Sequence, residues 1–225
     1  MNRIIKSKFF LSGGGDEVQS LPFDNFFFKN VPVNSKILYI PIALKANKLY
    51  ETAPTWFKNL VVSHNRGDIE ISIYDSSNKY GLQDLLKFNV IYIGGGNTWS
   101  LANDFRNSGF DKLLEEYVYH DRIVYGGSAG AIILGKQIDA QRDEKLGIDI
   151  SNLGFNFLNN YSIACHYQAM EKDFYKLWAS KNLTPLICLT EESGIYFNQN
   201  SHQVIGDAIA FNQFGELTEL QNGSN

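Results

Sequence analysis

The chain has 225 residues, of which 44% are hydrophobic and 20% are charged, a composition typical of a globular protein. Its 20 basic and 24 acidic residues give a formal net charge of −4, which argues against a basic face that binds nucleic acid. The first 15 residues hold no apolar run long enough for a signal peptide or a membrane helix. We therefore expect a cytoplasmic protein whose partners include neither nucleic acid nor a membrane.

The two cysteines, Cys165 and Cys188, are too few for a zinc site of their own or for a disulfide framework. They fit a reducing compartment, in which thiols stay free. No repeat, low-complexity segment or flexible linker divides the sequence. We expect a single α/β domain over residues 1–225.

Short apolar runs rich in β-branched and aromatic residues recur along the chain, and most of them end in turn residues. Their length and composition predict strands. Several are apolar throughout, which is typical of parallel strands that are buried on both faces of a sheet. In chain order, these runs cover residues 3–15, 36–44, 69–75, 90–96, 123–130 and 185–191.

Longer stretches with helical spacing of apolar residues separate the predicted strands. Trp56, Leu60 and Val61 predict a helix before residues 69–75, and apolar positions between 101 and 117 predict one or two helices before the next strand. Phe174, Leu177 and Trp178 predict another helix before residue 185 in the same way. This alternation predicts a doubly wound α/β fold, with a mostly parallel sheet flanked by helices.

The end of the sequence has a different pattern. Residues 194–220 form short apolar stretches joined by the turn sequences NQNS and NQFG, which predict a C-terminal antiparallel ribbon. In a parallel sheet of this kind, ligands bind beyond the carboxyl ends of the strands. The glycine-rich segments 94–97 and 126–130 both follow predicted strands, so both are expected at that edge.

The segment IVYGGSAGAIILG carries the strongest chemical signal. Residues 126–130 match the pattern G-x-S-x-G, directly after a predicted strand and directly before an apolar helical run, as in a nucleophile elbow. The turn projects the hydroxyl of Ser128 clear of the backbone, and the N–H of Ala129 would stabilise an oxyanion at the helix start. The alternative is a glycine-rich turn that only packs tightly or binds an anion.

A nucleophilic serine needs a base, which is most often histidine. His64 and His120 lie in polar stretches at predicted helix ends, and His202 lies in the turn NQNSHQ. His166 instead follows a short apolar run, at the expected functional edge of the sheet. We therefore take His166 as the candidate base, with a core or loop histidine as the alternative.

Two acidic residues are candidates for orienting this histidine. Glu191 follows the predicted strand 185–191, whereas Asp143 lies in a polar stretch. Position relative to the sheet favours Glu191, and Asp143 is the second choice. The neighbouring acids Glu192 and Asp139 remain open.

The second glycine cluster offers further backbone donors. Gly95, Gly96, Asn97 and Thr98 follow a predicted strand, so they are candidates for binding an oxyanion or the substrate. The cluster lacks the spacing of a dinucleotide site and the Gly-Lys-Ser/Thr ending of a nucleotide-binding P-loop. The glycines at 13–15 carry no residue placed for phosphate, and we assign them no function.

Taken in order, IYIGGGNTWSL, YGGSAGAIILG, a histidine after a strand and LTEESGIYF resemble the aspartyl dipeptidase (dipeptidase E) and cyanophycinase family of serine peptidases. The resemblance covers most of the chain. It implies a fold similar to class I glutamine amidotransferases and the cleavage of short peptides by a serine mechanism. Such a mechanism requires no cofactor and no metal.

The resemblance also implies roles for individual residues. Ser128 matches the nucleophile, His166 the base and Glu191 the acid, while Asp143 matches another family position regarded as the acid. The dipeptidase is expected to hold the aspartate of its substrate with an arginine beyond the histidine. At that place this sequence has Lys172 and Lys176 instead. A lysine would pair with a carboxylate as a point charge and not through the two-pronged guanidinium of arginine.

Other functions remain open at this stage. Glutamine amidotransferases carry cysteine where this chain has Ser128, so we expect no glutaminase activity. A non-catalytic or differently specific binding or regulatory module of the same fold is the main alternative, and a flavodoxin-like cofactor binder is a third. The sequence also leaves a homodimer open.

Overall fold

The computed structural model describes residues 3–199 and 201–220, and within these ranges the main sheet has seven strands in the order β3-β2-β4-β5-β1-β8-β9. β3, β2, β4, β5 and β1 run parallel, whereas β8 is antiparallel to β1 and β9 is antiparallel to β8. Their bounds are β1 (Lys8–Ser12), β2 (Lys36–Ile40), β3 (Glu70–Ile73), β4 (Val90–Ile93), β5 (Ile123–Gly127), β8 (Gly194–Asn198) and β9 (Ser201–Ile205).

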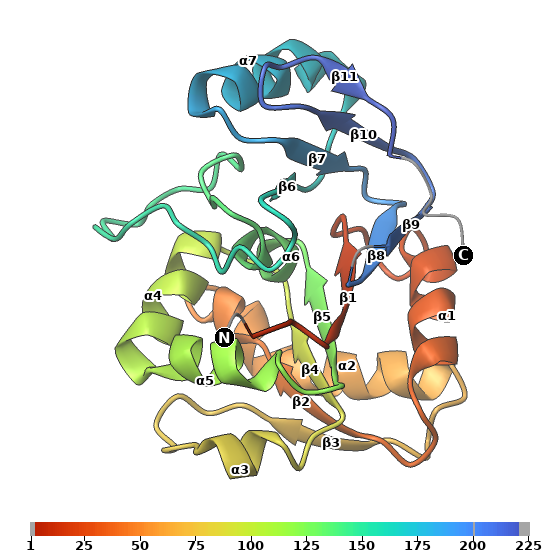
Figure 1. The fold of residues 1–225 in the computed structure, drawn as a ribbon. Helices are drawn as coiled ribbons and strands as arrows, with labels where there is room; N and C mark the ends of the chain where they lie inside the picture. The colour runs from red at the N-terminus through yellow and green to blue at the C-terminus, as the bar shows by residue number, and fades with distance from the viewer. Residues whose placement is uncertain (1–2, 200, 221–225) are drawn as a thin grey trace.

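Helices cover both faces of this sheet (Figure 1). α1 (Leu21–Asn30) and α2 (Leu49–Ser63) pack on one face, where Phe10, Tyr92 and Tyr125 of the strands belong to their apolar cluster. α4 (Thr98–Ser108), α5 (Phe110–Tyr117) and α6 (Ala129–Leu134) contribute to the cluster on the other face. Because side chains alternate along a strand, each central strand supplies both clusters. The predicted doubly wound architecture is therefore confirmed.

A second sheet corrects one expectation. The strand predicted at 185–191 is β7 (Leu186–Leu189), and it lies in a separate four-stranded sheet of order β11-β10-β7-β6. The other strands of this sheet are β6 (Ser162–Ala164), β10 (Ala208–Phe211) and β11 (Leu217–Thr218). An apolar run predicts a buried strand but not its partners, which here are β6 and the late strand β10.

α7 (Lys172–Asn182) lies against the second sheet, above the main sheet in Figure 1. The predicted helix is present, but its buried residues are Tyr175, Trp178 and Ala179, whereas Phe174 and Leu177 are exposed. The helix was thus predicted in the correct segment, but of the three apolar residues on which the prediction rested only Trp178 is buried. The remaining helical segments are η1 (Ile42–Leu44), α3 (Leu82–Leu85) and η2 (Ala169–Glu171).

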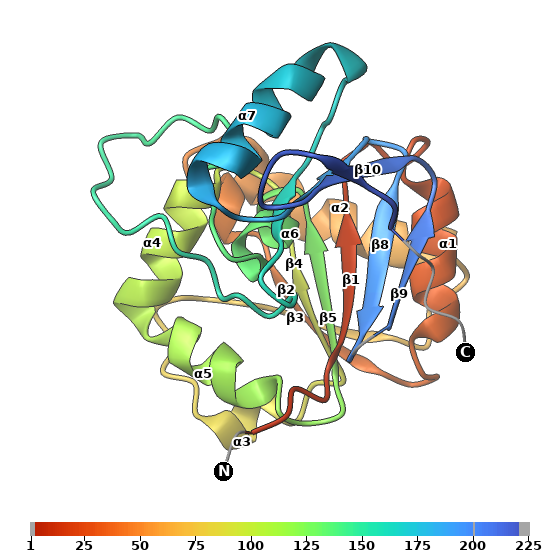
Figure 2. The same cartoon turned by 45° about the horizontal axis from the view of Figure 1, so that its top comes forward.

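The C-terminal ribbon is also present, although it is divided between the two sheets. β8 and β9 extend the main sheet, while β10 and β11 belong to the second (Figure 2). The turn NQFG is held by Asn212, whose Oδ1 accepts hydrogen bonds from the N–H groups of Phe214 and Glu216. The turn NQNS includes residue 200, which is outside the described residues.

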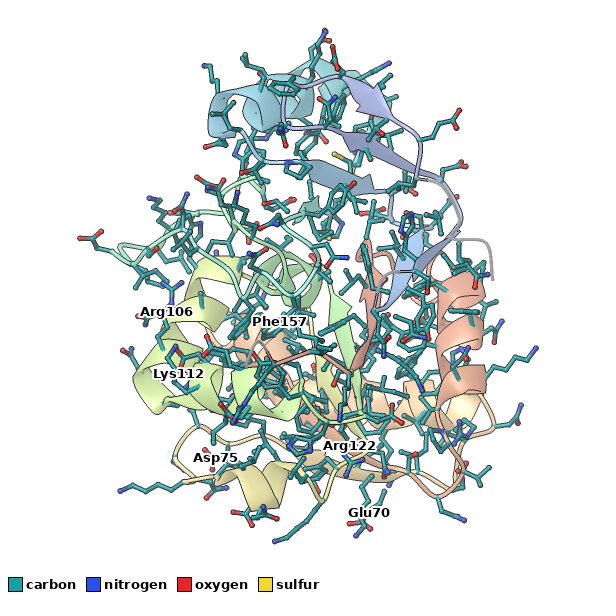
Figure 3. All side chains as sticks on the ribbon, viewed as in Figure 1. Glu70, Asp75, Arg106, Lys112, Arg122 and Phe157 are labelled. Carbon is teal, nitrogen blue, oxygen red and sulfur yellow. The ribbon has the colours of Figure 1, made fainter. Side chains whose placement is uncertain are left out.

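A long loop connects α6 to β6 and is fixed over α4. Arg106 donates hydrogen bonds to the backbone oxygens of Ser151 and Leu153, and Phe157 stacks on Phe9 with ring centroids 5.7 Å apart (Figure 3). At the start of α4, Asp143 and Glu144 of the same loop accept hydrogen bonds from Thr98 and Asn97. Within the described residues, no helix combines the length and apolar character needed to span a membrane.

Candidate active site

Ser128 stands at the turn between β5 and α6. Its backbone has φ 47° and ψ −110°, a strained conformation of the kind found at nucleophile elbows. The turn also depends on a missing side chain, since a Cβ at Gly130 would lie 2.3 Å from the backbone oxygen of Ile93. The elbow expected from the sequence is thus present as a strand, a tight turn and a helix.

His166 contacts Ser128 directly. Its Nε2 lies 2.8 Å from Ser128 Oγ, and its backbone N–H donates to the oxygen of Gly13 at 3.0 Å. The residue follows β6 and adopts φ 55°, which turns the chain at the end of the strand. The candidate base therefore follows a strand of the second sheet, and the candidate nucleophile follows a strand of the main sheet.

Glu191 completes a chain of hydrogen bonds. His166 Nδ1 lies 2.9 Å from Glu191 Oε1, and because a carboxylate only accepts, Nδ1 carries the proton and Nε2 is left to accept from Ser128. Gln19 Nε2 donates to Glu191 Oε2 at 2.8 Å. The hydrogen bond from His166, followed by that from Gln19, lowers the pKa of Glu191.

Asp143, the second candidate for the acid, lies elsewhere. Its Oδ2 accepts from the backbone N–H of Thr98 at 2.8 Å and from Thr98 Oγ1 at 2.6 Å. It therefore binds the first turn of α4. Asp139 is also engaged elsewhere, because its Oδ2 accepts from Asn152 Nδ2. Geometry thus brings Glu191 to His166 and leaves Asp143 and Asp139 in the connecting loop.

The second glycine cluster divides into two parts. A Cβ at Gly95 would lie 3.2 Å from Ser128 Cβ, so Gly95 is beside Ser128. Gly96 instead packs against η1, because its Cβ would lie 2.3 Å from the oxygen of Ala43. Ala129, next to Ser128, is the first residue of α6, where the backbone N–H groups have no partner within the helix.

The side chains of Asn97 and Thr98 serve the fold rather than the turn at Ser128. Asn97 caps α4, since its Oδ1 accepts from Ser100 N, and its Nδ2 donates to the oxygen of Glu144. Thr98 is buried and bound to Asp143. The backbone N–H groups, which we expected to contact an oxyanion or the substrate, have partners as well: that of Asn97 donates to the oxygen of Ala43 and that of Thr98 to Asp143 Oδ2, both at 2.8 Å.

The first loop of the chain, to which the sequence analysis assigned no function, lies at this site. Gly14 has φ +95°, and a Cβ there would lie 2.7 Å from both His166 Nε2 and Ser128 Cβ. Gln19, from the same loop, holds Glu191. The sequence did contain one indication that this loop lies at the site: its glycines directly follow a predicted strand, as the other two glycine clusters do.

A cavity of about 140 Å³ adjoins Ser128. Its walls come from the first loop, α1, α2 and the ends of β4 and β5, and they include Ser20, Asp24, Trp56 and Tyr125. Lys172 and Lys176 are exposed on α7 and are not among the described residues that line this cavity.

The other histidines do not share this arrangement. His64 packs on the ring of Phe28 and its Nδ1 lies 2.9 Å from the oxygen of Leu60. His202 packs against Phe197 at the edge strand β9, and His120 is exposed. Both cysteines are free and buried. Among the described residues, no group of three or more histidine, cysteine, aspartate or glutamate side chains is placed to hold a metal ion.

Comparison with known proteins gives a family. The sequence model of peptidase family S51 matches residues 9–205. The uncharacterized peptidase Lmo0363 of Listeria monocytogenes is 31% identical over 86 residues, which are 37% of this chain and 42% of that protein. The uncharacterized peptidase PM1590 of Pasteurella multocida is 28% identical over 134 residues, 59% of this chain and 62% of that protein. The matches thus span less than two thirds of these relatives.

Solved structures share the fold over a greater length. A Listeria monocytogenes EGD-e protein described as a candidate peptidase E aligns with a TM-score of 0.70 at 19% identity, covering 89% of this chain and 98% of the other. A peptidase from an acI-B1 Actinobacterium aligns with a TM-score of 0.69 at 20% identity, covering 99% of this chain and 97% of the other. At these identities the likeness establishes the fold.

Proposed function

This chain belongs to peptidase family S51, and from that premise we propose that it is a serine-type peptidase that cleaves short peptides through Ser128, His166 and Glu191. The observation that carries the proposal is the unbroken chain of hydrogen bonds from Glu191 through His166 to Ser128 Oγ, at 2.9 and 2.8 Å. A serine hydroxyl is a weak nucleophile unless such a base takes its proton.

The geometry supports the usual two-step chemistry. Ser128 Oγ attacks the substrate carbonyl while His166 Nε2 takes its proton, and Glu191 stabilises the imidazolium that forms. The imidazolium then gives this proton to the departing amine, which leaves an ester on Ser128. Water, deprotonated by His166, cleaves the ester, releases the acid and restores the serine.

Backbone N–H groups would stabilise the negative oxygen of the tetrahedral intermediates. Ala129 lies at the N-terminus of α6, where the helix dipole also favours negative charge, and Gly95 lies beside Ser128. The N–H of Ser128 itself donates to the oxygen of Ser12 at 3.1 Å, so it is engaged elsewhere. We therefore assign the oxyanion contacts to Ala129 and Gly95.

The cavity beside Ser128 supports a short substrate. Its volume of about 140 Å³ is well above the roughly 10–15 Å³ that a single water requires, but it is small for a folded or extended polypeptide. Its lining includes the buried side chains of Asp24 in α1 and Tyr125 in β5. Such a pocket suits one residue next to the cleaved bond, as in a dipeptidase or another exopeptidase.

The test is hydrolysis of a dipeptide panel, including Asp-Leu, by the wild type and by Ser128→Ala. We expect the wild type to cleave at least one dipeptide and Ser128→Ala to lose at least about 10³-fold in kcat, because the nucleophile is gone. Ser180→Ala is the matched control, because Ser180 lies on α7 and its hydroxyl donates to the backbone oxygen of Leu177 in the same helix. Wild-type turnover by a folded Ser128→Ala variant would rule out this nucleophile.

A further inference from the structure

The cavity beside Ser128 has an acidic wall. Among the described residues that line it, Asp24 is the one carboxyl, and there is no lysine, arginine or histidine. Asp24 is 2% exposed, in the first turns of α1. Ionising a buried carboxyl costs free energy unless a positive group or hydrogen-bond donors stabilise the charge. A buried acid such as Asp24 beside the proposed nucleophile therefore indicates a function in binding or catalysis.

The hydrogen bonds of Asp24 indicate where its proton is. Tyr125 donates its hydroxyl to Asp24 Oδ1 at 3.0 Å, and Ser20 Oγ lies 2.6 Å from Asp24 Oδ2. Ser20 Oγ is also 2.8 Å from the backbone oxygen of Asp16, which can only accept. A serine hydroxyl has one proton, so both contacts are satisfied when Ser20 donates to Asp16 and Asp24 donates to Ser20.

Burial agrees with this assignment, because desolvation raises the pKa of the Asp24 carboxyl above its usual range. Desolvation and the single proton of Ser20 both favour the neutral acid over the carboxylate. A positive group that enters would favour the ionised form, since an opposite charge within a few ångströms stabilises a carboxylate. In that form the carboxylate pairs with the cation.

The remaining walls suit a cation as well. Trp56 lines the cavity and is 39% exposed, whereas the rings of Tyr92 and Tyr125 are buried and stack on each other. Aromatic faces attract ammonium groups. A substrate carboxylate in this cavity would lie near Asp24, and the described lining residues include no basic side chain to pair with it.

We propose that this cavity is a substrate pocket for a protonated primary amine, which Asp24 binds next to the bond cleaved at Ser128. This inference rests on the proposed function and adds the substrate class. Two parts of a peptide carry this chemistry: the α-ammonium group of its first residue and the side-chain ammonium group of lysine. Both are positive at neutral pH, and either would fill the pocket without an extended chain.

Two matched substrate pairs distinguish these sources. Lys-Leu and norleucyl-Leu differ in the side-chain ammonium group, while Ala-Leu and propionyl-Leu differ in the α-ammonium group. We expect one pair to show at least about a 10-fold higher kcat/KM for the ammonium form, the size of a hydrogen bond to a charged group. In Asp24→Asn the same ratio should fall to about one.

Asp24→Asn is a suitable variant because an amide reproduces both hydrogen bonds of the neutral acid: it accepts from Tyr125 and donates to Ser20. Glu51→Gln is the control, since it removes an exposed acid of α2 that is not among the lining residues and should keep the wild-type ratio. Ratios near one for both pairs in the wild type, or an unchanged ratio in Asp24→Asn, would overturn the inference.

A binding measurement separates this inference from the proposed function. Calorimetry of Lys-Leu and Ala-Leu with Ser128→Ala should detect binding of at least one of them, and this binding should be lost in Ser128→Ala with Asp24→Asn. Such binding by a protein that cleaves no peptide would overturn the peptidase and keep the amine pocket. Cleavage without an ammonium preference would do the reverse.

Discussion

Gln19 donates a hydrogen bond from Nε2 to Glu191 Oε2 at 2.8 Å, across 172 positions of sequence. Its own Oε1 accepts from the backbone N–H of Asp16, which fixes the orientation of the amide. The loop after β1 therefore holds the outer oxygen of the carboxylate while His166 holds the inner one. Gln19 is thus a positioning residue for the proposed acid.

Gln19→Ala should lower kcat by about 10-fold and change KM little, since one hydrogen bond to a charged group is removed away from the substrate. Gln19→Glu should lower kcat further, because it places a second carboxylate against Glu191. Steady-state kinetics on the best dipeptide tests both changes. Equal kcat values for the wild type and both variants would show that Gln19 positions nothing.

Glu191→Gln and Asp143→Asn should separate catalysis from folding. Glu191→Gln should reduce kcat by roughly 10³–10⁴-fold, because His166 loses the acceptor that sets its tautomer. Asp143→Asn should keep kcat within about 10-fold and reduce stability by about 1–2 kcal/mol, since Thr98 loses a charged acceptor at the start of α4. Kinetics and denaturant unfolding check the pair, and the reverse order of kcat would move the acid to Asp143.

Gly14→Ala should inactivate the enzyme while the rest of the fold survives. The new Cβ would press on His166 and Ser128 at 2.7 Å, and φ +95° adds strain of about 1–2 kcal/mol for any L side chain. The exposed Gly67 is a matched control, because a Cβ there meets nothing within 4 Å. Circular dichroism should give folded spectra for both alanine variants, with peptide turnover lost only at position 14.

The pH dependence of stability should reveal the raised pKa of Asp24. Near pH 3 the carboxyl is protonated in both states; as pH rises past its unfolded value of about 3.9, the unfolded chain loses this proton while the folded chain keeps it. Folding stability contributed by Asp24 therefore falls with rising pH up to its folded pKa. Nearby Glu17 and His64 act on the same carboxyl, by raising and lowering its pKa respectively.

Asn does not titrate, so the Tm of Asp24→Asn relative to the wild type should increase from about pH 3.5 to pH 7. Thermal unfolding across this range measures the difference, with Glu51→Gln as the control, since Glu51 is an exposed acid of α2. A difference that is constant with pH, or that decreases, would mean that Asp24 is ionised in the folded protein.

Much of this organisation could be predicted because local signals coincided with the topology. The glycine-rich elbow at Ser128 needed only a strand before it and a helix after it, and both are local patterns. His166 and Glu191 each follow a short buried strand, so position after a strand pointed to both. β6 and β7 are paired and parallel, so His166 and Glu191 follow neighbouring strand ends at the same edge of the second sheet.

Other features depend on long-range pairing that no local pattern contains. β7 reads as a buried strand in either sheet, and only its partners β6 and β10 decide between them. Gln19 and Asp24 lie in a polar loop and an aromatic helix whose sequence gives no hint of their partners. Asn97 and Thr98 also follow a strand, but their side chains stabilise the start of α4: Asn97 caps the helix and Thr98 binds Asp143.

The two sheets divide the proposed triad, with Ser128 on one and both His166 and Glu191 on the other. Neither sheet alone holds a working set of groups, and the bond from His166 N–H to the oxygen of Gly13 is one of the ties between the parts. Regions of a protein can open separately and below the global unfolding energy. Activity therefore depends on how the two sheets pack against each other. Activity should be lost at a lower denaturant concentration than the one that unfolds the main sheet.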